Sequence, residues 1–459
     1  MRNTFLVPEL QELLANNDIQ AIREFCSSMH PALIADSLGG LEPSEVWEIL
    51  VHIPSQTQVE IFSHLDESVQ MEMVEVLKRE ELASLISEMP SDDRVDILKG
   101  IPENKREALM PAIAQAERED IRRLSSYPEG TAGAIMTSEY VTLSPFLTPE
   151  EALAKLRLEA PDKETIYYAY VVDDKRRLIG FVSLKDLILA PLNNRVKEIM
   201  HSDVIFARGG DDQEDAARKI QKYDLLALPV INGNDALVGI ITYDDAMDVI
   251  TQEQTEDMEK LMAITGSHEV GTYLKMPAWS HFKNRSLWII ALAFLGLISG
   301  LIVQNNEGLL LQFAILATFM PMLADTGGNT GSQSATLVIR ALALREITPK
   351  DVFRIFIKEL QVSVLLGFLL AVLAFGRVFL FSSGSSMSQG HSLYIVGIAV
   401  AFALALQVVT ATLIGALLPI VAVKLKFDPA VVASPALTTI VDITGLFIYF
   451  SIAKAILGI

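Results

Sequence analysis

The sequence predicts a multidomain fold: a cytosolic α-superhelix, then a pair of α/β repeats, then an α-helical membrane domain with five transmembrane helices. The first observation is composition. The 459 residues are 51% hydrophobic and 20% charged, which is too apolar for an ordinary soluble protein and too charged for a pure membrane bundle. The second is patterning, since a twelve-residue hydrophobic spacing and an internal repeat precede long uncharged runs that begin after Leu287.

Charge is divided between the two halves as unevenly as hydropathy. From Leu287 onward there are nine Lys+Arg and seven Asp+Glu, whereas the first 286 residues hold 28 and 50 and carry a net −22. Such a field repels nucleic acid and anionic membrane surfaces, and it attracts cations. We therefore expect divalent cations and a lipid bilayer as partners, and no nucleic acid.

Cysteine usage and the N-terminal segment favour a reducing compartment for the soluble half. Cys26 is the one cysteine of the sequence, which excludes an intrachain disulfide and any zinc or iron–sulfur site built from cysteines. The apolar run from Phe5 to Val7 ends at Pro8 and is too short for the core of a secretory signal. The soluble half is expected to stay in the cytoplasm.

Residues 18–114 alternate short amphipathic segments with turns. Apolar residues twelve apart close the segments, at Leu41, Ile53, Leu65, Leu77, Met89, Ile101 and Ile113. Helices of about nine residues at this spacing predict a stacked superhelix, because no single hairpin can bury its apolar face alone. Asp92, Asp93 and Asp96 crowd one turn and, taken alone, are typical of a solvated acidic face.

Residues 132–250 contain the same α/β unit twice. The segment Gly180-Phe-Val-Ser-Leu-Lys-Asp186 recurs as Gly239-Ile-Ile-Thr-Tyr-Asp-Asp245, and Ile135-Met136 recurs as Ile199-Met200. Each unit ends in a strand, a Ser/Thr-x-x-Asp motif and a helix. This repeat resembles a tandem pair of cystathionine-beta-synthase (CBS) domains.

In the CBS family this motif often holds the ribose of an adenine nucleotide. The resemblance implies a nucleotide, with ATP as the candidate cofactor, at Ser183 with Asp186 and at Thr242 with Asp245. Many CBS pairs bind no nucleotide, so a purely structural pair is the alternative.

Five predominantly apolar runs reach the length of about 20 residues that a bilayer requires. They are residues 287–303, 309–337, 360–380, 393–423 and 429–453. Basic residues gather before the first run, between the second and third, and between the fourth and fifth. Because such residues are retained in the cytoplasm, the soluble half is predicted inside and the C-terminus outside.

Two carboxylates, Asp325 and Asp442, lie within these runs. Asp325 follows Leu309 by sixteen residues and Asp442 follows Pro429 by thirteen, so a rise of about 1.5 Å per residue places both in the central third of the membrane. An ionisable group at this depth is costly and usually faces a water-filled path or a partner. A hydrogen-bonded structural acid is the alternative to an ion path.

Each carboxylate lies in a stretch of small and polar residues, Pro321 to Gln333 and Ser434 to Gly445. Such stretches are tolerated in a membrane where backbones pack closely or line a wet cavity. The candidate pore-lining residues are Asp325, Asn329 and Thr438. A close helix crossing without an ion is the alternative reading.

The order of these regions, with Gly-Gly-Asn-Thr-Gly-Ser-Gln in the second run and Pro-Ala-Leu-Thr-Thr-Ile-Val-Asp-Ile-Thr-Gly in the fifth, resembles the MgtE family of bacterial magnesium channels over essentially the full chain. The resemblance implies a superhelical domain (1–130), tandem CBS domains (131–250), a connecting helix (251–286) and a pore domain (287–459). It implies a multi-pass homodimer in the bacterial inner membrane, with the pore between two membrane halves. Mg²⁺ is then both the transported ion and the regulatory ion, which closes the channel by binding between the cytosolic domains.

Metal ligands follow from the resemblance by local motif. Asp442 is the implied selectivity residue. The implied regulatory ligands are Asp92, Asp96, Glu214, Asp224, Asp245, Asp248, Glu253, Glu256, Asp257 and Asp428. Several of these acids are spaced three to four residues apart after Asp245, which stacks them on one helix face. A solvated linker helix is the alternative.

Two rival functions are weighed against a channel. An ion-coupled carrier for Mg²⁺ or Co²⁺ shares these features and remains the alternative. An intramembrane zinc protease would need His-Glu-x-x-His in a membrane helix, but the one histidine after Leu287 is His391, in the predicted external loop. An enzyme is therefore not expected.

Overall fold

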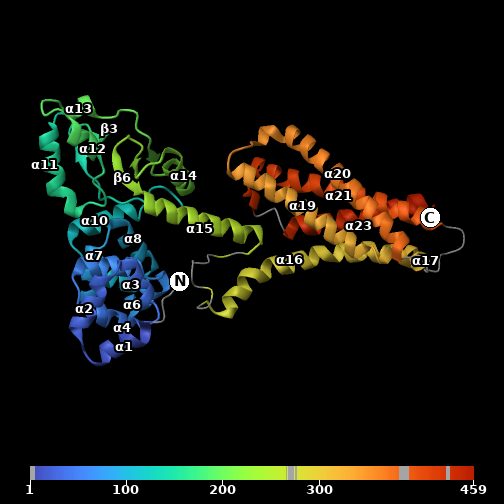
Figure 1. Cartoon of the computed structure of the whole chain (residues 1–459), viewed down its shortest axis with the longest axis horizontal. Coiled ribbons are helices and arrows are strands. Elements are labelled where there is room, and N and C mark those ends of the chain that lie inside the picture. The colour runs from blue at the N-terminus through green and yellow to red at the C-terminus, as the bar shows by residue number, and fades with distance from the viewer. Residues whose placement is uncertain are drawn as a thin grey trace. The chain divides into compact units, whose positions relative to one another are not determined.

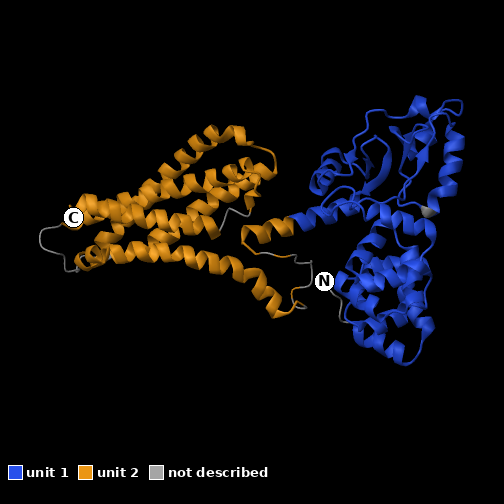
Figure 2. Cartoon of the chain, turned by 180° about the vertical axis from the view of Figure 1, so that it is seen from behind, with its two compact units in different colours: residues 1–253, 269–272 blue, residues 254–268, 273–459 orange. Residues whose placement is uncertain are grey.

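The computed structural model describes residues 6–264, 266, 273, 276–381, 392–430 and 435–458. The chain divides into two compact units, shown in different colours in Figure 2. Unit 1 is Met1–Glu253 with Glu269–Thr272, and unit 2 is Gln254–His268 with Tyr273–Ile459. Unit 1 holds the soluble helical and α/β regions, and unit 2 holds the long apolar helices.

Short helices fill residues 7–124 of unit 1 (Figure 1). They are α1 (Val7–Ala15), α2 (Ile19–Ser28), α3 (Pro31–Leu38), α4 (Pro43–Leu50), α5 (Ser55–Ser63), α6 (Glu67–Val76), α7 (Arg79–Glu88), α8 (Ser91–Gly100), α9 (Glu103–Leu109) and α10 (Gln115–Leu124). Proline lies at the N-terminal boundary of several, where its fixed φ favours a helix start.

The predicted superhelix is confirmed by the packing of these helices. Helix α3 packs on α5, α4 on α6, α5 on α7 and α8 on α10, so each layer buries the apolar face of a helix two along the chain. The seven apolar residues at the twelve-residue spacing are all buried in one core. The hydrophobic period therefore fixes the stacking.

The α/β region consists of two three-stranded sheets with the same topology. The first repeat contains β1 (Thr142–Leu143), α11 (Pro149–Glu159), β2 (Tyr168–Val172), β3 (Leu178–Ser183), α12 (Leu184–Leu189) and α13 (Val196–Ile199). The second contains β4 (Ala207–Arg208), α14 (Gln213–Tyr223), β5 (Ala227–Ile231), β6 (Leu237–Thr242) and α15 (Tyr243–Leu261). In each sheet the first strand is parallel to the second and the second is antiparallel to the third.

The lead-in segment of each repeat pairs with the sheet of the other. Thr137, before β1, bridges Ile240 of β6, and His201, before β4, bridges Phe181 of β3. Both Ser/Thr-x-x-Asp motifs consequently begin at the end of the third strand of a sheet and enter the following helix. The predicted tandem pair is confirmed.

Unit 2 is a bundle of long apolar helices (Figure 1). Its helices from residue 278 onward are α16 (Ala278–Asn305), α17 (Glu307–Gln312), α18 (Ala314–Ala317), α19 (Met320–Ala343), α20 (Val352–Phe381), α21 (Leu393–Lys424) and α23 (Pro435–Leu457). Helix α21 packs against α19, α20 and α23, and α16 packs against α23. Four helices of the described residues have the length and composition of a membrane span: α16, the segment Pro349–Leu380, α21 and α23.

The second apolar run is not the continuous helix that the sequence predicted from Leu309. It divides into α17, α18 and α19, with Phe313 outside helical geometry and Pro321 in the first turn of α19. Asp325 therefore lies in the second turn of α19, and its predicted depth, counted from Leu309, no longer follows. At about 1.5 Å per residue, the 24 residues of α19 are still long enough to cross a bilayer.

Backbone carbonyls at this break and in the first turn of α19 accept hydrogen bonds from side chains of three other helices. Tyr449 of α23 donates to the Leu316 carbonyl at 2.9 Å, and Arg377 of α20 donates to the Thr318 carbonyl at 3.2 Å. Gln407 of α21 donates to the Leu323 carbonyl at 2.9 Å. Broken helices persist at membrane depth only when their polar groups are satisfied in this way.

Candidate ion pathway and regulatory sites

The two small-residue stretches of the membrane unit pack against each other and against α21. A Cβ on Gly415 of α21 would overlap the Gly331 carbonyl of α19, and a Cβ on Gly327 or Gly445 would overlap the Gln407 side chain. A Cβ on Gly328 of α19 would lie 3.1 Å from Cγ2 of Thr438 on α23. Glycine is therefore required for this crossing, where the backbones of the two motifs and of α21 pack closely, and the role of the crossing in an ion path stays a prediction.

The crossing also carries the carboxylates that the sequence singled out. Asp442 is half-buried on α23, and its buried Oδ1 has no hydrogen-bond partner among the described residues. Asp325 is exposed on α19 and accepts a hydrogen bond from Asn329 Nδ2 at 3.2 Å. A buried carboxylate oxygen without a donor is costly, and a purely structural acid would have one. Within the described part of the chain, Asp442 Oδ1 has none.

A second group of carboxylates gathers around the motif of the second CBS repeat. Thr242 donates its hydroxyl to Asp245, which faces Asp92 and Asp93 at the start of α8 and Asp244 beside it. Burial and the charges of Asp244 and Asp93 outweigh the threonine bond and raise the pKa of Asp245 to about 6. Burial and Asp245 raise the pKa of Asp92 well above its ordinary value, and Asp92 Oδ1 has no partner among the described residues.

Two further acids extend this acidic cluster, which we define as Asp92, Asp93, Glu164, Asp244, Asp245 and Asp248. Desolvation and the charges of Asp245 and Glu139 raise the pKa of Glu164 to about 7. Burial and Asp244 raise the pKa of Asp248, with His64 acting in the opposite direction. Carboxylates that resist ionisation beside one another are what a divalent cation would stabilise.

The motif of the first CBS repeat has the same local geometry in a different environment. Ser183 Oγ donates to Asp186 at 2.6 Å, and His201 Nε2 lies 3.2 Å from the same carboxylate. Burial acts to raise the pKa of Asp186, but the hydrogen bonds from Ser183 and His201 outweigh it and hold the pKa below its ordinary value. Asp186 is thus an ionised acceptor next to an exposed imidazole.

Other predicted ligands in unit 1 have local partners. Asp96 is exposed and pairs with Lys99 at 2.9 Å, and Glu214 pairs with Arg218. Asp224 ends α14 in a left-handed conformation, with φ 51°. Glu253 accepts a hydrogen bond from Gln213 Nε2 at 2.7 Å. The structure brings Asp92, Asp245 and Asp248 into one cluster but does not bring Glu214 and Asp224, at the two ends of α14, to a common point.

In unit 2 a lysine lies between two of the predicted ligands. Lys260 Nζ is 2.8 Å from Glu256 of the same helix and 3.0 Å from Asp428 before α23. Burial lowers the pKa of Lys260, but its bonds to Glu256 and Asp428 outweigh this and raise it. Asp257, one residue further along α15, is exposed. An ammonium group thus joins carboxylates that the sequence assigned to Mg²⁺.

Within the described residues, no three His, Cys, Asp or Glu side chains are arranged to hold one metal ion directly. The lack of such a direct site among the described residues is compatible with Mg²⁺, which dehydrates reluctantly and is commonly bound through its waters by one or two carboxylates. The roles of all eleven predicted metal ligands stay predictions.

Comparison with known proteins identifies the chain. The family described as divalent cation transporter matches residues 320–452, the MgtE intracellular N domain matches 29–130, and CBS domains match 132–193 and 196–252. The magnesium transporter MgtE of Thermus thermophilus is 43% identical over 338 residues, which cover 74% of this chain and 72% of that protein. The chain belongs to the MgtE family of magnesium transporters. The Bacillus subtilis MgtE is 39% identical over 335 residues, covering 73% of this chain and 71% of that protein.

Solved structures similar to this MgtE-family chain cover its soluble part. A crystal structure of the cytosolic domain of the Mg²⁺ channel MgtE in complex with ATP is 38% identical with a TM-score of 0.50, covering 52% of this chain and 98% of that one. The soluble part of a magnesium transporter is 31% identical with a TM-score of 0.51, covering 54% and 97%. The family assignment and the fold class predicted from the sequence are therefore confirmed.

Several residues of these sites were not found from the sequence of the MgtE-family chain. Asp244 and Glu164 join Asp92 only through the fold, and Gln407 lies in an otherwise apolar helix. Lys260 carried a signal, because it follows Glu256 by four residues, the spacing of a helical ion pair.

Proposed function

We propose that this MgtE-family magnesium transporter is a Mg²⁺-selective channel that imports Mg²⁺ into a bacterial cell and is closed by cytosolic Mg²⁺. Family membership makes the chain a multi-pass membrane transporter with an intracellular N-terminal domain, and not an enzyme. The observation that carries the finer proposal is Asp442, whose buried Oδ1 has no donor among the described residues.

Asp442 fits the chemistry of a hydrated ion. Mg²⁺ keeps several of its waters, and a carboxylate can accept hydrogen bonds from them without stripping the shell. One Asp442 from each chain of a homodimer, related by a two-fold axis, would give two acceptors for one ion. The adjoining glycine crossing of α19, α21 and α23 holds this carboxylate on a rigid part of the bundle.

The surface of α16 is compatible with the proposed homodimer and equally with contact to lipid. None of the side chains in its most apolar window is buried within the chain, so this helix needs lipid or a second chain as its environment. Basic residues between α19 and α20 and after α21 put those connections in the cytoplasm, which places the C-terminus outside. This topology makes residues 382–391 an extracellular loop, and these residues are not among those that the structure describes.

Regulation is proposed to act through the acidic cluster and the acids of α15. At low Mg²⁺ the carboxylates of Asp92, Asp245 and their neighbours repel one another, and a divalent cation removes that repulsion. Asp96, Glu214, Asp224, Glu253, Glu256, Asp257 and Asp428 are proposed as further ligands. At Glu256 and Asp428 the ion would have to displace or move Lys260.

ATP is proposed as a ligand of the first CBS repeat. A homologous cytosolic domain was crystallised with ATP. The ionised Asp186, with Ser183 and His201 beside it, can accept ribose hydroxyl hydrogen bonds without facing other acids. Thr242 and Asp245 are less suited to a nucleotide, because the cluster would repel its phosphates.

The test is Mg²⁺ uptake and single-channel current with Asp442→Asn, which keeps the side-chain size and loses the charge. We expect a normally folded dimer whose Mg²⁺ conduction falls at least about tenfold, the loss of one charge-assisted hydrogen bond or more. Asp325→Asn is the comparison at the other candidate pore-lining acid; because its carboxylate already has a donor in Asn329, we expect a smaller loss of conduction than in Asp442→Asn. Unchanged Mg²⁺ current in Asp442→Asn would contradict the pore assignment, and Mg²⁺ uptake without unitary currents would favour an ion-coupled carrier.

A further inference from the structure

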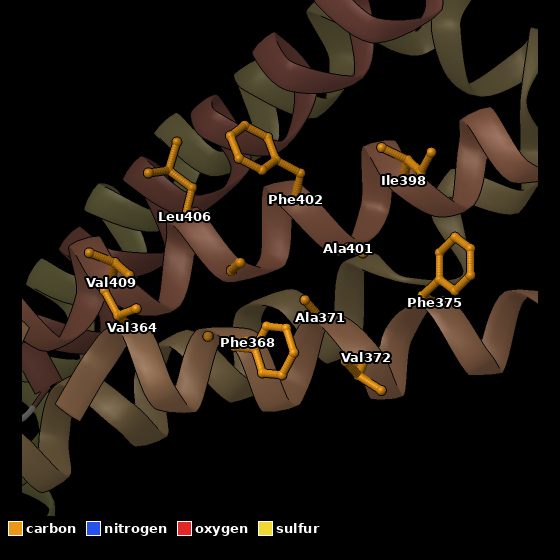
Figure 3. A pocket seen from close by; sticks show the side chains of 12 residues that line it. Val364, Phe368, Ala371, Val372, Phe375, Ile398, Ala401, Phe402, Leu406 and Val409 are labelled. Carbon is orange, nitrogen blue, oxygen red and sulfur yellow. The ribbon is translucent and has the colours of Figure 1, made fainter. Parts of the chain in front are cut away.

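Two pockets of unit 2 differ in what they offer to a ligand. One is a groove between α20 and α21 lined by apolar side chains alone, among them Phe368, Phe375 and Phe402 (Figure 3). It can accommodate hydrocarbon but contains no group that selects one ligand over another. The second pocket, of about 400 Å³, is bounded by α19, α20 and Thr412 of α21 and combines charged with apolar side chains.

Four charged side chains line this second pocket: Arg340, Glu346, Lys358 and Glu359. Glu359 accepts a hydrogen bond from Ser334 Oγ of α19 at 2.7 Å. Within the described part of the chain, neither Arg340 nor Lys358 forms an ion pair, although carboxylates line the same pocket. Two cations and two anions therefore remain available to a ligand that carries both charges.

The pocket changes character along its depth. Arg340 lies in the last turn of α19 and Lys358 in the second turn of α20, at the ends that the basic connections place in the cytoplasm. From Arg340 to Thr330, ten residues of α19 extend the lining by about 15 Å, half of a roughly 30 Å hydrocarbon core. Leu337, Val362 and Leu366 provide apolar walls along this length. A ligand that fits both parts is amphipathic.

Basic pockets between membrane helices on the cytoplasmic side are typical sites for lipid headgroups. An anionic headgroup would meet Glu346 and Glu359 as well as the two cations, and would gain little net attraction. A headgroup with a phosphate and a primary ammonium matches both pairs, because the ammonium has three hydrogen atoms to donate to carboxylates. A quaternary ammonium has none.

We propose that this pocket binds phosphatidylethanolamine, with its phosphate on Arg340 and Lys358, its ammonium on Glu346 and Glu359, and the start of an acyl chain against the apolar walls. The lipid would join the C-terminal end of α19 to the start of α20. This inference is independent of the pore and regulatory assignments.

Native mass spectrometry of the full-length protein tests the proposal. The protein is incubated with phosphatidylethanolamine, phosphatidylcholine and phosphatidylglycerol of identical acyl chains in equal amounts. We expect phosphatidylethanolamine to be retained about tenfold over phosphatidylcholine, the contribution of one charge-assisted contact. Equal retention of the three lipids, or preference for phosphatidylglycerol, would overturn the proposal without any variant. Loss of bound lipid on adding millimolar inorganic phosphate would identify a phosphate site instead.

Variants locate the binding. Glu346→Gln with Glu359→Gln should remove the preference for phosphatidylethanolamine over phosphatidylcholine, and Arg340→Gln with Lys358→Gln should weaken retention of both. Arg354→Gln is the control on the same helix, because Arg354 is 88% exposed, pairs with Asp351 and does not line the pocket. If a double variant fails to fold, Glu359→Gln alone should lower the preference while Lys358→Arg preserves it. An unchanged preference in Glu359→Gln would contradict the assignment.

Discussion

The two CBS repeats place a hydroxyl and a carboxylate at the same point of the fold, but the two carboxylates differ in their electrostatic environment. Ser183 and Thr242 both end the third strand of a sheet and both donate to the Asp three residues on. Asp186 has an imidazole beside it and a pKa below its ordinary value, whereas burial and neighbouring acids raise the pKa of Asp245 to about 6.

The motif therefore determines the local geometry of the hydroxyl and the carboxylate, whereas residues outside the motif determine the pKa of that carboxylate. Besides Asp244, which is next to it on α15, the acidic neighbours of Asp245 come from α8 and from the loop before β2, neither of which belongs to its own repeat. The first repeat is thereby suited to an uncharged hydroxyl donor such as a ribose, and the second to a cation.

The largest expected effect is that of pH on the binding of Mg²⁺ to the acidic cluster. Because Asp245 and Glu164 have pKa values of about 6 and 7, both are ionised at pH 7.5 and largely protonated at pH 5.5, so protons compete with Mg²⁺ on acidification. Because both carboxylates must lose a proton, we expect the Mg²⁺ concentration that protects the full-length protein from limited proteolysis to rise roughly a hundredfold between these pH values. Asp245→Asn with Glu164→Gln should flatten the dependence, and a pH-independent midpoint in the wild type would contradict the cluster assignment.

A second effect, about tenfold, is expected for ATP. Asp186→Asn removes the ionised acceptor of the first repeat and should weaken ATP binding by the value of one charge-assisted hydrogen bond. Asp245→Asn, the same change in the second repeat, should leave ATP affinity unchanged. Calorimetric titration of both variants measures the difference, and equal losses would show that the repeats do not divide the two ligands.

The smallest effect concerns stability, and its sign differs between the repeats. The lowered pKa of Asp186 contributes stability that is present at pH 7.5 and is lost as the pH falls through the pKa of Asp186 in the folded protein. The raised pKa of Asp245 has the opposite effect: ionised Asp245 destabilises the folded protein above about pH 6, and protonation relieves this cost at lower pH. Ser183→Ala should lower stability by about 1 kcal/mol, or about 3 °C in Tm. Asp245→Asn should raise Tm at pH 7.5 when a chelator removes divalent cations. Thermal scans in which both variants melt at a lower temperature than the wild type would contradict this prediction.

Much of the fold was predictable because local period and tertiary packing agree. The twelve-residue spacing from Leu41 to Ile113 marks helix ends that are all buried, and the repeat of Gly180–Asp186 at Gly239–Asp245 predicted two equivalent sheets. The break between α17 and α19 was missed because residues 309–320 are predominantly apolar, and only Pro321 signalled an interruption. Its stability comes from side chains on other helices, which no local pattern reveals.

The sites were predictable only in part. Asp92 and Asp245 were assigned as ligands from motifs, but Glu164 and Asp244 joined them through contacts among three separate segments. Lys260 was missed because the sequence was read as a series of acids, and its bond to Asp428 spans residues far apart in the chain. Charge counts indicate that the soluble half attracts cations, but they do not show which carboxylates already have a basic side chain as a partner.

The most direct test of the proposed regulation is Mg²⁺ titration of the cytoplasmic face of inside-out patches. Asp92→Asn with Asp245→Asn, which removes the two acids at the centre of the cluster, is compared with Asp186→Asn. We expect the wild type and Asp186→Asn to close at the same Mg²⁺ concentration, and the double variant to require at least about tenfold more. Overlapping closure curves for all three proteins would contradict the proposed regulation.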